Sequence, residues 1–169
     1  MVNSKIGRPT KERTALLRNQ VSYLLWNEKL ETTLAKAKAV RSVAEKYITL
    51  AINSYEDTVK VVKTITNEKG VKVKQEFIND GPKKLNARRK MMAYLYDLQE
   101  VKGEKESKAA FTAKTKDINH PLIEKMFNVY APKYAARAKE LGQGGGYTRI
   151  LKLDLRRGDA AQRVIVKLI

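Results

Sequence analysis

The chain has 169 residues, and its hydrophobic content of 43% is enough for one modest core but not for two large domains. Its 35 Lys and Arg against 18 Asp and Glu give a formal net charge of +17, so a compact fold repels itself unless an anionic partner neutralises it. Cysteine is absent and histidine occurs once, which excludes a disulfide framework, a thiol nucleophile and the usual zinc sites. No segment resembles a signal peptide or a membrane span, so a soluble cytoplasmic protein is expected.

The first part of the chain predicts two amphipathic helices with a short strand between them. Leu17, Val21 and Leu24 recur at helical spacing after a basic start. The β-prone residues 30–34 then predict a strand that passes directly into the second helix. One face of that helix carries the apolar residues Ala37, Val40, Ala44, Ile48 and Ala51.

The hydrophobic period changes to two between Thr58 and Phe77, where β-branched residues alternate with polar ones around the turn-forming TNEKGV. We therefore expect a β-hairpin there. Gly81 and Pro82 end it, and the apolar spacing over residues 82–98 predicts a third helix. Beside its apolar stripe lie Arg88, Arg89 and Lys90.

The next segment, residues 99–117, is charged and poorly periodic, which predicts a loop or mobile insertion. A helix is expected from Asn119, and Pro132 bends or ends it because proline lacks an amide hydrogen. A short basic helical piece over residues 133–141 follows. The apolar residues on one face of the Asn119 helix are Leu122, Ile123, Met126, Phe127 and Tyr130.

The glycine run GQGGG does not predict a phosphate-binding loop. Such a loop follows a strand and precedes a helix, whose N-terminus holds the anion, whereas this run follows a helix and leads into the β-prone Tyr147–Leu151. We interpret the glycines as a left-handed C-cap of the preceding helix, followed by a flexible linker to the strand. The chain then turns at Arg156–Asp159 and returns in a strand with Val164, Val166 and Leu168 on one face.

No residue pattern supports catalysis. His120 precedes a helix, where histidine is usually a surface or capping residue, and Asp154 and Asp159 flank a turn that carboxylates commonly stabilise. No nucleophile elbow, zinc-binding helix motif or Walker sequence is present. We expect no enzymatic activity, no metal, no cofactor, no small-molecule substrate and no membrane partner.

The cations occur in clusters rather than as an even coat, which favours nucleic acid as the partner. Arginine is well suited to this because its planar fork binds phosphates bidentately. Dispersed clusters suggest a surface wrapped by nucleic acid, whereas a repressor concentrates its reading residues on one helix. The residues expected to contact RNA are Lys5, Arg8, Arg13, Arg18, Asn19, Lys36, Lys38, Arg41, Arg88, Arg89, Tyr147, Thr148, Arg149, Lys152, Arg156 and Arg157.

At the glycine run two interpretations stay open. In the first, Gly144–Gly146 bring the backbone close to RNA, Tyr147 stacks on a base or sugar and Arg149 binds a phosphate. In the second, Tyr147 packs under the helices and Arg149 pairs with Glu140 or Asp154.

Two other functions of the protein also remain open. The composition permits an architectural DNA-binding protein. A nucleic-acid-processing enzyme is the other alternative, but the sequence lacks the acidic cluster that such an enzyme would need.

Three motifs in order, TTLAKAK, GGYTRILK and RRGDAA, together with LNARRKMMAYL, closely resemble the bacterial ribosomal protein L17 family of the large subunit. The resemblance implies a structural protein that binds large-subunit ribosomal RNA near the exit of the peptide tunnel, beside other large-subunit proteins. It implies an α+β fold with helices on a small mixed three-stranded sheet formed by residues 30–34, 147–155 and 163–169. The β-hairpin expected from the alternating pattern lies outside the resemblance, as an insertion. The expected organisation is a single domain over residues 1–169 with insertions near 54–81 and 99–116.

Overall fold

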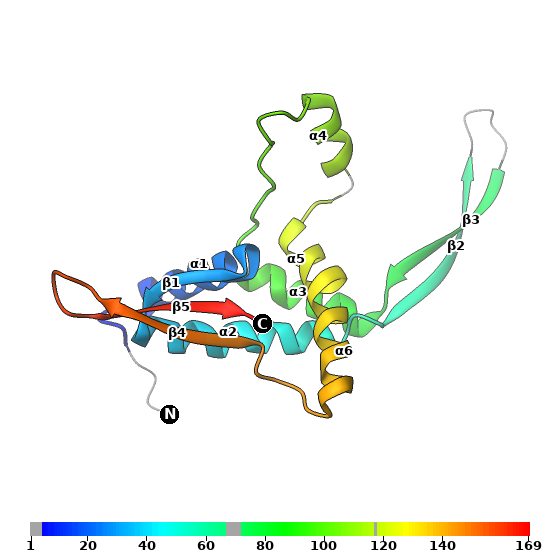
Figure 1. Cartoon of the computed structure of the whole chain (residues 1–169). Coiled ribbons are helices and arrows are strands. Elements are labelled where there is room, and N and C mark those ends of the chain that lie inside the picture. Colours follow the sequence, from blue (N-terminus) through cyan, green and yellow to red (C-terminus); the bar gives the residue numbers. More distant parts are fainter. Residues whose placement is uncertain (1–4, 67–71, 117) are drawn as a thin grey trace.

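The computed structural model describes residues 5–66, 72–116 and 118–169, and it confirms the expected α+β class (Figure 1). None of the helices in these residues is long and apolar enough to cross a lipid bilayer. The elements in chain order are α1 (Thr10–Asn27), β1 (Lys29–Thr33), α2 (Leu34–Ile52), β2 (Thr58–Thr66), β3 (Lys72–Asp80), α3 (Pro82–Tyr94), α4 (Lys108–Thr115), α5 (Pro121–Lys125), the π-helical turn η1 (Met126–Tyr130), α6 (Ala131–Leu141), β4 (Thr148–Leu155) and β5 (Gln162–Leu168).

The helix α2 lies at the centre of the core. It contacts α1, α3, η1, α6 and each strand of the three-stranded sheet. The five residues of its predicted apolar face are fully buried, which confirms that face. Three of them are alanines, whose small side chains allow neighbouring elements to approach α2 closely.

The three-stranded sheet has the order β1-β5-β4, and both pairings are antiparallel. The expected mixed sheet is therefore wrong in strand direction, although all three predicted strands are present with ends shifted by one residue. Val166 lies opposite Leu30 on one side and Ile150 on the other, so these apolar side chains share a face. That face packs against α1 and α2, while the opposite face is open to solvent.

Pro132 does not end the helix that precedes it. The chain continues from α5 through η1 into α6, and Pro132 is in the first turn of α6. The Ala131 amide donates to the Met126 carbonyl five residues back, so a π-helical turn absorbs the disruption that proline causes. The apolar face predicted from Asn119 onward stays continuous and buried across this turn.

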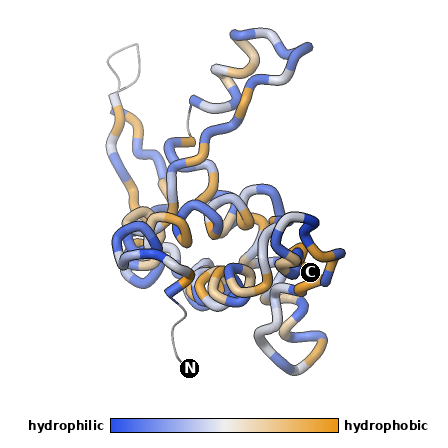
Figure 2. Tube along the Cα trace, turned by 90° about the vertical axis from the view of Figure 1, so that its left-hand side faces the viewer, coloured by the Kyte–Doolittle hydropathy of each residue, from blue (hydrophilic) through white to orange (hydrophobic). Residues whose placement is uncertain are grey.

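Both inserted segments project from the body (Figures 1 and 2). The strands β2 and β3 pair antiparallel from Thr58 opposite Asp80 to Thr66 opposite Lys72, which confirms the predicted hairpin; its predicted turn lies outside the described residues. We call β2 and β3 the arm. The segment 99–116 was expected to be a loop but contains α4, whose first turn is capped by the Ser107 hydroxyl accepting from the Ala110 amide at 3.1 Å.

The base of the arm is closed by Asp57. Its carbonyl accepts from the Gly81 amide at 2.8 Å, and its carboxylate accepts from the Lys83 amide at 2.7 Å at the start of α3. A Cβ on Gly81 would lie 2.4 Å from this carboxylate, so a larger residue there would displace the carboxylate from its present position. The arm thus begins and ends at one point of the body.

Replacing Thr58–Phe77 with a short Gly-Ser linker should leave the cooperative thermal unfolding of the body intact, because Asp57 and Asp80 remain in place. The matched variant Asp57→Ala, which keeps the arm but removes the cap on α3, should lower the free energy of unfolding by about 1 kcal/mol. Loss of cooperative melting in the linker variant would show that the arm belongs to the core.

The buried tyrosines predict how the fold responds to alkali. Burial is the main cause that raises the pKa of Tyr47 and of Tyr134 to about 12, and it raises the pKa of Tyr130 as well. Since the pKa of an unfolded tyrosine is about 10, their contribution to stability is complete below that pH and is lost as pH rises through the folded values. We expect ultraviolet absorbance to report ionisation of these tyrosines together with the loss of helical circular dichroism. Full ionisation of all eight tyrosines with helicity unchanged would contradict this burial.

Candidate nucleic-acid interface

Three chain segments far apart in sequence meet at one end of the sheet. Thr33, the last residue before α2, lies opposite Arg163, which follows the β4–β5 turn. Thr32 accepts a hydrogen bond from Gln20 of α1 at 3.3 Å, so the earlier residues of α1 extend past this end. Figure 1 accordingly shows the starts of α1 and α2 and the β4–β5 turn together at the left.

We call this region the basic end, because exposed or half-buried cations from these three segments gather there. Two of them have acidic partners: Arg8 pairs with Glu12 at 3.4 Å, and the Arg156 Nε donates to Asp159 at 2.8 Å. The others form no ion pair within residues 5–66, 72–116 and 118–169. The cations of the basic end are Lys5, Arg8, Lys11, Arg13, Lys36, Lys38, Lys152, Arg156 and Arg157.

The local field at this end favours anions. The helices α1 and α2 both begin here, and no described side chain caps either N-terminus, so backbone amides and helix dipoles add to the side-chain charges. The hydrogen bond from Arg156 is the main cause that lowers the pKa of Asp159 to about 2, so this carboxylate stays charged and bound to Arg156. Arg157, the other arginine of the turn, forms no ion pair with any acid that the structure describes.

Arg18 is half-buried, and its guanidinium is hydrogen-bonded within the protein rather than left free as the sequence suggested. Its Nε donates to the Tyr94 carbonyl at 2.6 Å and its Nη2 to the Ala93 carbonyl at 3.1 Å, at the C-terminus of α3. The guanidinium also lies 5.1 Å from the centre of the Tyr96 ring. Arg18 thus fastens α1 to α3, while the adjacent Asn19 is exposed.

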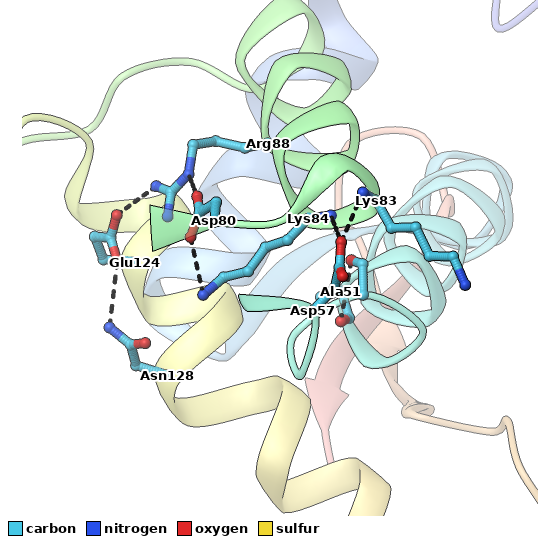
Figure 3. A network of polar contacts seen from close by, with 9 residues as sticks. Ala51, Asp57, Asp80, Lys83, Lys84, Arg88, Glu124 and Asn128 are labelled. Atoms are coloured by element: carbon cyan, nitrogen blue, oxygen red, sulfur yellow. Dashed lines mark hydrogen bonds and ion pairs between the residues drawn. The ribbon is translucent and has the colours of Figure 1, made fainter. Parts of the chain in front are cut away.

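Arg88 is likewise held inside the protein (Figure 3). Its Nε donates to Asp80 at 2.6 Å and its Nη1 to Glu124, while Lys84 pairs with Asp80 at 3.0 Å. Burial by itself would raise the pKa of Asp80, but the hydrogen bonds from Arg88 and Lys84 outweigh it and lower that pKa. This network joins the end of the arm to α3 and α5, whereas Arg89 is exposed and has no acidic partner in the described chain.

Tyr147 follows the second of the two interpretations, in which it packs under a helix. Its side chain is only 6% exposed, and its ring centre lies 5.0 Å from that of Tyr134 on α6. The next residue, Thr148, is also buried, and its amide and hydroxyl donate to one oxygen of Glu45 at 3.3 and 2.7 Å. Because Arg41 pairs with that same oxygen at 3.3 Å, its charge is partly neutralised as well.

Arg149 behaves differently from its two neighbours. It is exposed and pairs with neither Glu140 nor Asp154, nor with any other acid that the structure describes. The glycines before it act as the sequence predicted: Gly142, with φ of 63°, is the left-handed C-cap of α6. The run therefore connects a helix to a strand, the reverse of a phosphate loop.

Two lysines outside the predicted set lie next to Arg149. Lys167 of β5 is directly opposite Arg149, and Lys29 of β1 is directly opposite Lys167. Neither belongs to a cluster in the sequence. Only the strand register brings them together, so no local signal could have found them.

The two adjacent arginines of α3 provide a direct test of these assignments. Arg88→Gln should lower the free energy of unfolding by about 1–3 kcal/mol, because it removes the charged donor that joins Asp80 to Glu124. Arg89→Gln should change it by less than about 0.5 kcal/mol, as an exposed substitution does. Chemical denaturation measures both values. Equal stability of the two variants would contradict the structural role of Arg88.

The chain is similar to known ribosomal proteins over nearly its whole length. The sequence model of the family described as "Ribosomal protein L17" matches residues 16–169. The chain is 41% identical to "Large ribosomal subunit protein bL17" of Lachnospira eligens, covering 98% of this chain and 97% of that protein. It is 36% identical to the bL17 of Acetivibrio thermocellus at the same coverage, and 34% identical to that of Streptococcus equi subsp. zooepidemicus over the full length of both.

Proposed function

The chain belongs to the ribosomal protein L17 family, and we propose that it takes its place in the large ribosomal subunit by binding ribosomal RNA through the basic end. It is a structural component of the ribosome rather than an enzyme. The proposal includes a position near the exit of the peptide tunnel, beside other large-subunit proteins of the cytoplasmic ribosome. Family resemblance over nearly the whole chain supports that position.

One observation carries the RNA-binding proposal: cations from three segments, most of them without an acidic partner in the described residues, meet at one end of the sheet together with the starts of two helices. Concentrating like charge there opposes folding unless a polyanion is bound. The guanidinium groups of Arg13 and Arg157 can bind phosphate through two hydrogen bonds each, while Lys36 and Lys38 supply single positive charges. Affinity then comes from phosphate neutralisation and specificity from the shape of the folded RNA.

Duplex DNA is the competing ligand. Against it, the cations of the basic end come from two helix starts and a turn, so no single helix presents a set of side chains for reading the major groove. Competition between large-subunit ribosomal RNA and duplex DNA at physiological salt separates the two, and we expect the RNA to win.

The salt dependence of RNA binding tests the mechanism. The logarithm of the affinity should fall linearly with the logarithm of salt concentration, at about 0.7 per phosphate contact on single strands. The variant Lys36→Gln, Lys38→Gln and Arg157→Gln should reduce that slope by about 2, since it removes three contacts. A control with the same charge change, Lys102→Gln, Lys105→Gln and Lys108→Gln near α4, should leave the slope nearly unchanged. A flat salt response of the unmodified chain would refute electrostatic binding.

A further inference from the structure

The open face of the three-stranded sheet carries a straight row of three cations. Lys29, Lys167 and Arg149 lie directly opposite one another across β1, β5 and β4, and all three side chains are exposed. Strand alternation sets them on the face away from the buried Leu30 and Val166. The row therefore faces solvent along its whole length.

This arrangement is unfavourable for the chain alone. Adjacent strands lie about 4.8 Å apart, and like charges directly opposite each other destabilise a sheet. None of the three cations forms an ion pair with any acid in the described part of the chain. The nearest acid on this face, Glu31 in the next row, is already held by the Arg163 Nε at 2.9 Å.

The neighbouring row adds an apolar strip. Leu151 and Ile165 lie directly opposite each other, one row from Arg149 and Lys167, and Leu151 is 47% exposed. Cations beside exposed apolar side chains suit a ligand with charged groups along one edge and less polar groups along the other. A nucleic-acid strand, with its phosphates and its sugars and bases, has that character.

We propose that this row is a second RNA-binding site, in which a single strand of ribosomal RNA crosses the sheet with its phosphates on Lys29, Lys167 and Arg149. The row is about 10 Å long, since it spans two inter-strand gaps, and so it matches a line of phosphates rather than one anion. Leu151 and Ile165 contact the sugars or bases beside it. This site rests on the proposed function but is separate from the basic end, because it lies at the opposite end of the three strands.

The triple variant Lys29→Gln, Arg149→Gln and Lys167→Gln tests the site with purified large-subunit ribosomal RNA. Its dissociation constant should rise by about tenfold or more at physiological salt, and the salt slope should fall by about 0.7 for each phosphate lost. The control Lys102→Gln, Lys105→Gln and Lys108→Gln, with the same charge change, should shift the dissociation constant by less than about threefold. The free triple variant should melt at the same or a higher temperature in low salt, because repulsion within the row is removed.

If the triple variant and the control variant have equal dissociation constants for the RNA, the proposed site is refuted. The same result is expected if the row binds an acidic protein instead of RNA. A lower melting temperature of the free variant would also overturn it, by showing that the row stabilises the fold. If the triple variant does not fold, the single variant Lys167→Gln, at the centre of the row, replaces it in the same measurements of RNA affinity and melting temperature. Absence of salt-dependent RNA binding by the unmodified chain would instead refute the proposed function itself.

Discussion

The small side chains on the buried face of α2 are the constraint on which the rest of the fold depends. Ala37, Ala44 and Ala51 allow close approach, and Val40 and Ile48 fill the space between them. The sheet packs against this helix, as do α1, α3, η1 and α6. Because β1 enters α2 without a loop, the start of α2 is held at one end of the sheet. The position of the basic end is thus a consequence of how the core is packed.

Burial divides the arginines into two groups with different roles. Arg18 and Arg88 are half-buried, and each satisfies its donors with carbonyl or carboxylate oxygens from other elements. Exposed arginines such as Arg89 and Arg149 lack such partners within the described residues, so their charge is available to a polyanion. A guanidinium withdrawn from water must be paired, since an unpaired one costs several kcal/mol, about the whole stability margin of some domains.

The two projecting segments are added to the body with little change to its core. The arm leaves and returns at Asp57 and Gly81, whose backbone hydrogen bond closes its base, so its length does not alter the packing around α2. Within the arm, apolar residues remain on both surfaces: Val62 on one face is 57% exposed, and Val73 on the other is 42% exposed. Such residues are tolerated in an arm that forms its own backbone hydrogen bonds, whereas the body could not leave its apolar face uncovered.

The sequence by itself determined the class of the fold, the buried face of α2, the strand positions, the arm and the basic character of the surface. Each of these depends on the period of apolar residues or on net charge, which are local or summed properties. Tertiary structure alone decided three other features. Strand direction and register placed Lys29 and Lys167 beside Arg149. Packing of α6 on β4 buried Tyr147, and contacts between distant elements enclosed Arg18 and Arg88. These depend on which segments meet in space, and pairing between distant segments leaves no trace in the local pattern of a single chain.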